Sequence, residues 1–478
     1  MTRCILLRGI TVAGGILAMA GSPTSAMAAN LGMVADNATH SVIVFDADTD
    51  TVLGTVALPS PNVVTGDCSI TPDQTRGFVT DFTSRIHVID LTASPPSLAG
   101  GPNPIPISNF GEDTSISPDG QFLVVCDGGV PQPISVIDIA TQAEVSTFSL
   151  PSDCNSVEVC SDRSVLATSS RTGGVYRLTI DHAGTLTDTG EVLFGDWTPN
   201  NVVCAPGGTS GYVVLGFQAQ IRSFTIPISP TDFSVLSGFG ISGLVNPRGD
   251  RAYVRTVGNL TDKYVDVFGY DSTTGALDAI PLFTIPTIAS PRFFGMDQMA
   301  IHPDGSKLYV SRPQALNVYD ASNGNLLTTI QLPGASATGV CLASNRSPDC
   351  TNATASPATL WPPDHELTLV GITGVTDPDA DPVTVTATSV FQNEPLQGSS
   401  ADAGPTAPDA TLSPLQLRAE RNGNPKTPGN GRIYHVSFMA DDGKGGTCTG
   451  TVRVCVPHDQ RASSTCVDGG PLYNSLTP

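Results

Sequence analysis

Short apolar runs of strand length, separated by polar turns, recur through most of this chain. The repeating unit has an apolar strand, a tight turn, a second apolar strand, a polar loop and a strand that ends in Asp; residues 301–310 (IHPDGSKLYV) show its first half most clearly. Proline presets the backbone for such a turn, and Asp or Gly suits the next position. The turns start 41 to 56 residues apart, at Pro72, Pro118, Ser161, Pro206, Pro247 and Pro303. This period is that of one four-stranded blade of a β-propeller.

The two ends of the repeat region complete the predicted ring. Six turns leave one blade unaccounted for, and the region starts at residues 33–36 with a strand that has no inner strand before it. Residues 338–342 supply an apolar strand after the last full unit. We therefore expect a seven-bladed propeller over residues 29–343. Its first blade is built from both ends of the region, because such closure removes exposed sheet edges.

The third strand of the unit is equally regular, as in residues 41–46 (SVIVFD), 86–90 (IHVID), 134–138 (ISVID) and 317–320 (NVYD). Together with the turns, these strands resemble the YVTN-type β-propeller repeats of bacterial and archaeal surface proteins. That family is related in fold to the lactonase-type propellers. The resemblance covers residues 31–343, and it implies the fold while leaving the activity open.

The repeat stops after residue 343, and a second module is expected there. Residues 344–358 are predicted to be a polar linker. Residues 359–458 hold five or more short apolar runs, some with the alternation of strands that bury one face. This is the size of an immunoglobulin-like sandwich, and residues 441–446 (DDGKGG) resemble a motif in Ig-like repeats of secreted bacterial proteins. With residues 459–478 as a flexible tail, the predicted fold class is all-β: a seven-bladed β-propeller followed by a small Ig-like β-sandwich.

Composition and charge agree with this fold and exclude one class of partner. The chain has 48 Gly, 39 Pro and only 14% charged residues, which suits many strands and turns. Its formal net charge of −21 repels phosphate backbones, so nucleic acid is not an expected partner.

The N-terminal segment has the features of a secretory signal. Arg3 and Arg8 precede a short apolar run at residues 10–21, and Ala26 and Ala28 give a small-x-small cleavage pattern. We predict a signal peptide over residues 1–28. No later run reaches the 18 or so apolar residues of a membrane span, so the protein is expected to be secreted, periplasmic or bound at the cell surface.

The cysteines are better explained by disulfides or buried thiols than by metal binding. Eleven cysteines are present, and ten remain once Cys4 in the signal segment is set aside. Six lie in the predicted propeller and four beyond it, and none has the CxxC spacing of a zinc or redox site. Disulfides are expected in an oxidising compartment.

A ring of polar residues is the main candidate for a ligand site. When the blades are aligned on their turns, the residue five before each turn is polar: Asp67, Asp113, Ser156, Asn201, Ser242 and Gln298. This position starts the innermost strand and is expected at one mouth of the central channel. Oxygen ligands around a small opening suit Ca²⁺, so Asp67 and Asp113 are candidate metal ligands. The alternative is that the mouth is simply hydrated and polar.

A second candidate cation site lies in the C-terminal module. Asp377, Asp379 and Asp381 alternate, so an extended chain would place all three on one side. Related Ig-like and cadherin-like domains use such acidic turns for Ca²⁺. Two intervening prolines also fit an ordinary turn between strands.

The sequence carries no established catalytic signature. It has no Gly-x-Ser-x-Gly elbow, no HExxH and no phosphate loop with a lysine, and it identifies no catalytic residue. The first interpretation is therefore a non-enzymatic binding or scaffold protein, whose partner is an unidentified protein, glycan or small molecule. One alternative is a lactonase-like or other metal-assisted hydrolase acting on a small ligand at the channel mouth. A structural component of a surface layer is the other.

Overall fold

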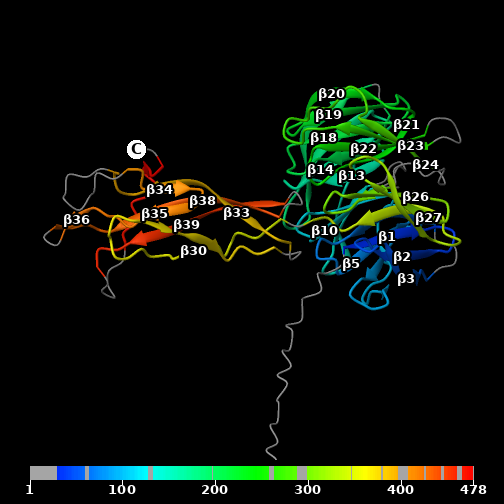
Figure 1. Ribbon diagram of the computed structural model, residues 1–478. Coiled ribbons are helices and arrows are strands. Elements are labelled where there is room, and N and C mark those ends of the chain that lie inside the picture. The colour runs from blue at the N-terminus through cyan, green and yellow to red at the C-terminus, as the bar shows by residue number, and fades with distance from the viewer. Residues whose placement is uncertain are drawn as a thin grey trace, which may run out of the picture.

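The computed structural model describes residues 30–59, 64–126, 133–195, 198–257, 263–287, 299–345, 347–377, 381–396, 407–424, 427–442, 446–459 and 466–476. The predicted signal peptide lies outside these ranges. Within them the chain forms strands and turns and no helix. Figure 1 shows the strands up to β29 gathered into one body and those from β30 onward in a second, elongated body.

Seven antiparallel sheets make up the first body within the described ranges, and each has at least four strands. In the first three sheets the strands are β29 (Ala337–Leu342), β1 (Leu31–Asp36), β2 (Ser41–Asp46) and β3 (Thr51–Ala57); β4 (Thr65–Ile70), β5 (Arg76–Asp81), β6 (Arg85–Asp90), β7 (Ser97–Leu98) and β8 (Ile105–Pro106); and β9 (Asp113–Ile116), β10 (Phe122–Cys126), β11 (Ile134–Asp138) and β12 (Ala143–Phe148).

The other four sheets follow in chain order. Their strands are β13 (Ser156–Val159), β14 (Ser164–Ser169), β15 (Gly174–Ile180) and β16 (Leu186–Phe194); β17 (Pro199–Cys204), β18 (Ser210–Leu215), β19 (Gln220–Thr225) and β20 (Ser229–Val235); β21 (Phe239–Val245), β22 (Arg251–Val257), β23 (Lys263–Gly269) and β24 (Phe283–Thr287); and β25 (Met299–Ile301), β26 (Lys307–Arg312), β27 (Ala315–Asp320) and β28 (Leu326–Gln331). These sheets form a β-propeller, as the sequence period predicts.

The repeated turn closes each inner hairpin in the way its residues require. At residues 302–306, the Gly305 amide donates to the His302 carbonyl at 2.8 Å, and the Ser306 amide donates to Asp304 Oδ1 at 2.7 Å. Gly305 has a φ of +73°, a conformation that glycine adopts without strain. The Pro-Asp-Gly motif of the repeat therefore forms the turn of this hairpin.

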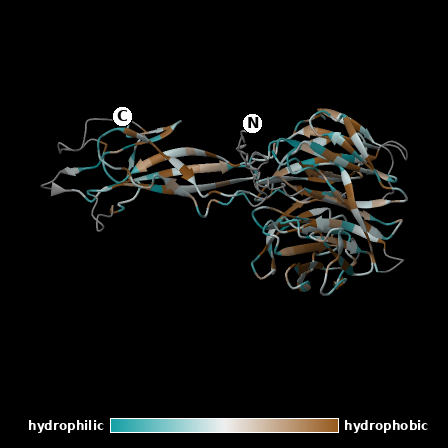
Figure 2. Ribbon diagram, turned by 60° about the horizontal axis from the view of Figure 1, so that its bottom comes forward, coloured by the Kyte–Doolittle hydropathy of each residue, from teal (hydrophilic) through white to brown (hydrophobic). Residues whose placement is uncertain are grey.

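The core lies between neighbouring blades. The middle strands are buried on both faces, as in β10, whereas the outer strand β12 alternates between exposed and half-buried residues. Apolar side chains of adjacent sheets pack together, for example Phe45 of the first sheet against Tyr309 of the last, with ring centroids 5.4 Å apart. Figure 2 shows the hydrophobic residues concentrated along the propeller strands. Each large side chain buried in this way contributes roughly 1.5–3 kcal/mol.

Both ends of the region build the first sheet, as predicted. β29 pairs antiparallel with β1, placing Val340 opposite Val34. A disulfide joins Cys68 on β4 to Cys341 on β29, across 273 residues of sequence. A second disulfide, Cys160–Cys204, links the fourth and fifth sheets. Cross-links over such long loops restrict the unfolded chain and so favour the closed ring.

Two described cysteines of the propeller remain thiols, Cys126 and Cys154. The Cys126 thiol donates to the Cys154 carbonyl at 3.1 Å, and burial raises the pKa of Cys126 well above its usual value. We expect no reaction of the chain from residue 29 with a thiol reagent while it is folded, because both thiols are buried away from the reagent. After unfolding without reductant, two thiols per chain should react. Detecting no thiol after unfolding would instead show a fifth disulfide.

The second body contains a main sheet and smaller ones. The main sheet is ordered β39 (Thr447–Val456), β38 (Arg432–Asp441), β33 (Thr384–Gln392) and β40 (Tyr473–Asn474). The remaining strands are β30 (Thr354–Ser356) with β32 (Gly371–Thr373), β31 (Leu367–Leu369) with β35 (Leu415–Arg418) and β34 (Ala410–Leu412), and β36 (Gly423–Asn424) with β37 (Thr427–Pro428).

Parts of the predicted linker and tail are tied to this second body. β30, inside the predicted linker, pairs with β32, and Cys350 is bridged to Cys448. The tail, expected to be flexible, is held by the Cys455–Cys466 disulfide and by the pairing of β40 with β33. Both segments therefore contribute to the fold, although neither shows a strand pattern in its residues.

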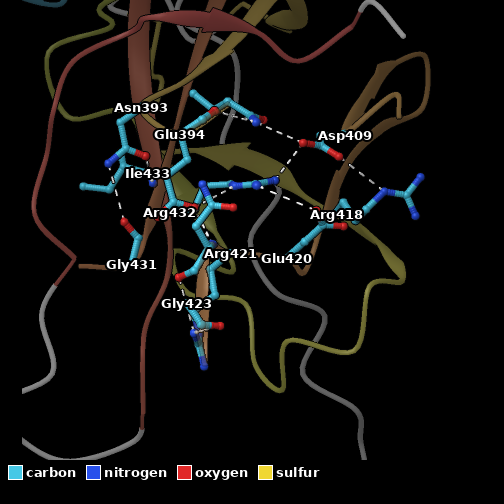
Figure 3. A network of polar contacts seen from close by, with 12 residues as sticks. Asn393, Glu394, Asp409, Arg418, Glu420, Arg421, Gly423, Gly431, Arg432 and Ile433 are labelled. Atoms are coloured by element: carbon cyan, nitrogen blue, oxygen red, sulfur yellow. Dashed lines mark hydrogen bonds and ion pairs between the residues drawn. The ribbon is translucent and has the colours of Figure 1, made fainter. Parts of the chain in front are cut away.

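A buried charge network occupies the end of this body (Figure 3). Arg432 is fully buried and lies 2.7 Å from Asp409, 3.3 Å from Glu394 and 3.8 Å from Glu420. The Tyr434 hydroxyl accepts a further bond from the same guanidinium at 3.3 Å. Arg432 thus contacts all three carboxylates, whereas Arg418 is paired with one of them, Asp409, at 3.6 Å, which makes Arg432 the centre of the network.

Candidate functional site

The innermost strands carry five of the six predicted ring residues at matching positions. Asp113 and Ser156 start β9 and β13, and Asp67, Asn201 and Ser242 lie within β4, β17 and β21. All five side chains are buried. Gln298 lies outside the described residues.

Four of these side chains share one structural role. Each accepts a hydrogen bond from a backbone amide of the next inner strand: Thr114 to Asp67 at 3.3 Å, Val157 to Asp113 at 2.9 Å, Val202 to Ser156 at 3.3 Å and Gly243 to Asn201 at 2.9 Å. The polar position therefore joins blade to blade by supplying acceptors to buried inner-strand amides. Aligning the blades on their turns located this polar position in the sequence. The alignment did not reveal that its side chains join neighbouring blades.

Ser242 faces a different environment from the other ring members. It lies opposite Arg255 of β22 in the sheet register. Arg255 is fully buried and donates to the Ser311 hydroxyl at 3.1 Å and to the Ser311 carbonyl at 2.9 Å. Burial lowers the pKa of Arg255 to about 10, so the guanidinium is still charged at neutral pH. A fixed positive charge thus lies one strand outward from the ring.

Asp67 and Asp113 form a carboxyl pair. The Thr114 amide lies 3.3 Å from Asp67 Oδ2 and 3.0 Å from Asp113 Oδ1, which brings the two carboxyls together, and two adjacent carboxylates repel. The Thr114 hydroxyl donates to Asp67 Oδ2 at 3.0 Å. Burial, partly offset by these hydrogen bonds, raises the pKa of Asp67 to about 7.

Glu158 adds a third carboxyl that the sequence analysis overlooked. It lies on β13, two residues after Ser156 and on the same side of the strand. The residue as a whole is half-buried, unlike the buried Asp67 and Asp113. Burial, with a smaller contribution from the charge of Asp67, raises the pKa of Glu158 to about 8. The carboxyl therefore carries a proton at neutral pH.

The turn alignment did contain a signal for Glu158. Three residues before the turn, the other blades carry Ser69, Ser115, Val203, Leu244 and Ala300. Glu158 is the one charged residue in this series. A single acid at a position that is otherwise small or apolar is costly to bury without a function.

The three carboxyls are here called the channel acids (Asp67, Asp113 and Glu158), and the pKa values of Asp67 and Glu158 lie near neutral pH. General acid–base catalysis is most efficient when the pKa of the catalytic group lies near the working pH. Asp67 and Asp113 are buried, whereas Glu158 is partly open. Glu158 is therefore the channel acid with the most access to solvent.

The pKa of Asp67 has a consequence for stability. When the pKa of an aspartate is higher in the folded state than in the unfolded state, folding becomes less favourable as the pH rises from the unfolded pKa near 4 to the folded pKa. Above the folded pKa this loss of stability stays constant. For Asp67 the cost is on the order of 4 kcal/mol at pH above 7. We expect Asp67→Asn to keep both Thr114 bonds and to gain stability relative to wild type between pH 4 and 7.5, as measured by calorimetry of the propeller transition.

The exposed residue Asp188 on β16 offers a matched control for that comparison. Asp188→Asn removes one negative charge without affecting the channel. If the stability difference between Asp67→Asn and wild type were the same at pH 4 and pH 7.5, the raised pKa would be refuted.

The predicted calcium sites remain predictions. Asp379 lies outside the described residues, and Asp377 Oδ1 accepts the Asp381 amide at 3.1 Å, which closes a turn. Over the ranges that the structure describes, no group of three or more His, Cys, Asp or Glu side chains is arranged to hold a metal ion.

No protein-family model and no curated protein sequence matches the chain. Among solved structures, it is similar to a functionally unknown protein from Desulfotomaculum acetoxidans, at 24% identity and a TM-score of 0.57 over 66% of this chain and 99% of that one. It also resembles a candidate 6-phosphogluconolactonase from Bacteroides fragilis, at 13% identity and a TM-score of 0.55 over 67% and 99%. The periplasmic gluconolactonase of Pseudomonas aeruginosa aligns at 15% identity and a TM-score of 0.53 over 66% and 98%.

These likenesses define the class of the fold, a β-propeller shared with lactonase-type proteins. They also correct the first interpretation of function. The neighbours from Bacteroides fragilis and Pseudomonas aeruginosa, and another from Bacteroides uniformis, are named as lactonases. These names contradict a non-enzymatic scaffold as the first interpretation and agree better with the hydrolase alternative.

The disulfides place the protein outside the cytoplasm, because such bonds persist in oxidising compartments. The periplasmic neighbour agrees with this location. A search of the described residues for a helix with the length and hydrophobicity of a membrane span finds none.

Proposed function

We propose that the propeller is a lactonase-like hydrolase that opens a small lactone at the mouth of its central channel. The observation that carries this proposal is Glu158, a partly exposed channel acid that holds a proton up to about pH 8. The lactonase names of the structural neighbours support the choice of reaction.

Glu158 would act as the general acid in this reaction. Water adds to the lactone carbonyl carbon, and the ring C–O bond breaks. The leaving oxygen takes the proton of Glu158, and the proton released by the water returns to the Glu158 carboxylate. Asp67 is a positioning residue here, because its charge helps to keep Glu158 protonated.

The charge of the chain indicates the kind of lactone. A net charge of −21 repels a phosphorylated substrate and leaves a neutral one unaffected. A neutral sugar lactone such as glucono-δ-lactone therefore fits better than its 6-phosphate.

We also propose the finer architecture behind this function. The seven sheets are the blades of a YVTN-type propeller, and the second body is an Ig-like module. An N-terminal signal peptide exports the chain. N-terminal sequencing of the secreted protein tests the last point, since the mature chain should start at residue 29.

The hydrolysis test uses the purified full-length mature protein and glucono-δ-lactone, with acid release followed by a pH indicator. The rate should exceed the spontaneous rate and should saturate with substrate. Parallel assays with EDTA and with Ca²⁺ test the predicted cation. A folded protein that accelerates neither δ-lactones nor γ-lactones would refute the proposal.

A further inference from the structure

A groove of about 670 Å³ crosses the outer face of the main C-terminal sheet. Strand alternation explains its polar lining: Tyr434, Val436 and Phe438 of β38 point into the core, so His435 and Ser437 point outward. The groove belongs to the second body and is separate from the propeller channel.

One wall of the groove is a loop fixed at both ends. Cys466 is held by its disulfide to Cys455 of β39. At the other end, the Leu472 amide donates to the Gln392 carbonyl at 3.1 Å, and Tyr473 pairs with Gln392. The intervening residues, including Asp468, are thus anchored against the sheet before any ligand arrives, which lowers the cost of binding.

Asp468 orients the two basic side chains of the groove. Its Oδ1 lies 2.9 Å from His435 Nε2, and its Oδ2 lies 3.1 Å from Arg453 Nε. The Gly470 amide donates to Oδ1 at 2.8 Å. This bond, together with the two basic neighbours, holds the pKa of Asp468 below its usual value. The Arg453 side chain is nevertheless 67% exposed, so its guanidinium is accessible to a ligand.

The rest of the groove offers hydroxyls and an aromatic ring. Ser389, Ser437 and Thr451 face one another across three strands, in the row next to His435 and Arg453. Phe391 lies beside His435 at the other edge of that row. Hydroxyl groups exchange hydrogen bonds with sugar hydroxyls, and an aromatic face packs against the C–H face of a sugar ring.

We propose that this groove binds a saccharide that carries a carboxylate. The carboxylate pairs with Arg453, the hydroxyl row contacts the sugar hydroxyls, and Phe391 supports the ring. The exposed guanidinium of Arg453 selects an anionic ligand locally, against the repulsion of the chain's net charge of −21, because guanidinium and carboxylate match in shape and charge. The site does not depend on the proposed lactonase activity.

The test is isothermal titration calorimetry of the full mature protein with tetragalacturonate, galacturonate and a neutral galactose tetramer. We expect the acidic tetramer to bind at least about tenfold more tightly than the neutral one. Arg453→Met should weaken acidic binding by about tenfold or more. Arg248→Met removes an exposed arginine from a propeller turn and should leave binding unchanged.

The acidic monomer separates two sources of the same ligand chemistry. Monomer binding equal to tetramer binding supports a site for a free sugar acid, and tighter tetramer binding supports a site for an acidic glycan. The proposal is overturned if tetragalacturonate does not bind, if the neutral tetramer binds equally well, or if Arg453→Met binds like wild type. None of these results would bear on lactone hydrolysis.

Discussion

Replacing Glu158 with Gln is expected to lower kcat/KM for glucono-δ-lactone by about 100-fold, within the usual range for loss of a general acid. Gln keeps the size of the side chain and cannot deliver a proton to the leaving oxygen. The burial that raises the pKa of Glu158 acts on the charged form, so the neutral amide should fold normally. Steady-state kinetics at pH 7, with the spontaneous rate subtracted, measure the effect.

Glu366→Gln is the matched control for this variant. Glu366 is exposed and lies in the second body, so the same change of charge there should leave kcat/KM unaltered. A Glu158→Gln enzyme with wild-type kcat/KM would remove Glu158 from the mechanism. Equal losses in both variants would point to a general effect of charge.

Replacing Arg432 with Met is expected to destabilise the second body by about 3–5 kcal/mol. The substitution leaves Asp409, Glu394 and Glu420 close together with no central cation (Figure 3). Burial already raises the pKa of Asp409, and loss of the Arg432 charge would raise it further. Differential scanning calorimetry should show the transition of the second body moving to lower temperature, with the propeller transition unchanged.

Arg453→Met provides the control in the same body. Arg453 is mostly exposed and pairs with one carboxylate, so its removal should cost no more than about 1 kcal/mol. If Arg432→Met were no more harmful than Arg453→Met, the buried network would not be what stabilises this part of the fold.

The blades could be predicted from sequence because their signal is local. A turn such as residues 302–306 is specified by its own Pro, Asp and Gly, and the period between turns sets the size of a blade. The pairing of β1 with β29 also followed, since the first strand of the region lacked an inner neighbour.

The roles of the ring residues could not be predicted, because they depend on contacts between blades. The bond from the Val157 amide to Asp113 joins residues of different sheets, and no local pattern specifies it. Glu158 was visible in the alignment, but its significance depends on burial and on the charge of Asp67.

The fold of the second body could also be predicted from the sequence only in part. Its strands are short, and the pairing of β40 with β33 and the partner of Cys466 are choices among several that the sequence allows. The correction of the functional interpretation has a related cause: propellers host many activities, so the fold alone did not identify a hydrolase.

The pH dependence of kcat/KM for glucono-δ-lactone tests the central claim most directly. If protonated Glu158 is the general acid, kcat/KM of the wild type should fall as the pH rises through about 8, and Glu158→Gln should lack this fall. A wild-type profile that stays flat from pH 6 to about pH 9.5, or a variant that shows the same fall, would contradict the proposed role of the channel acids.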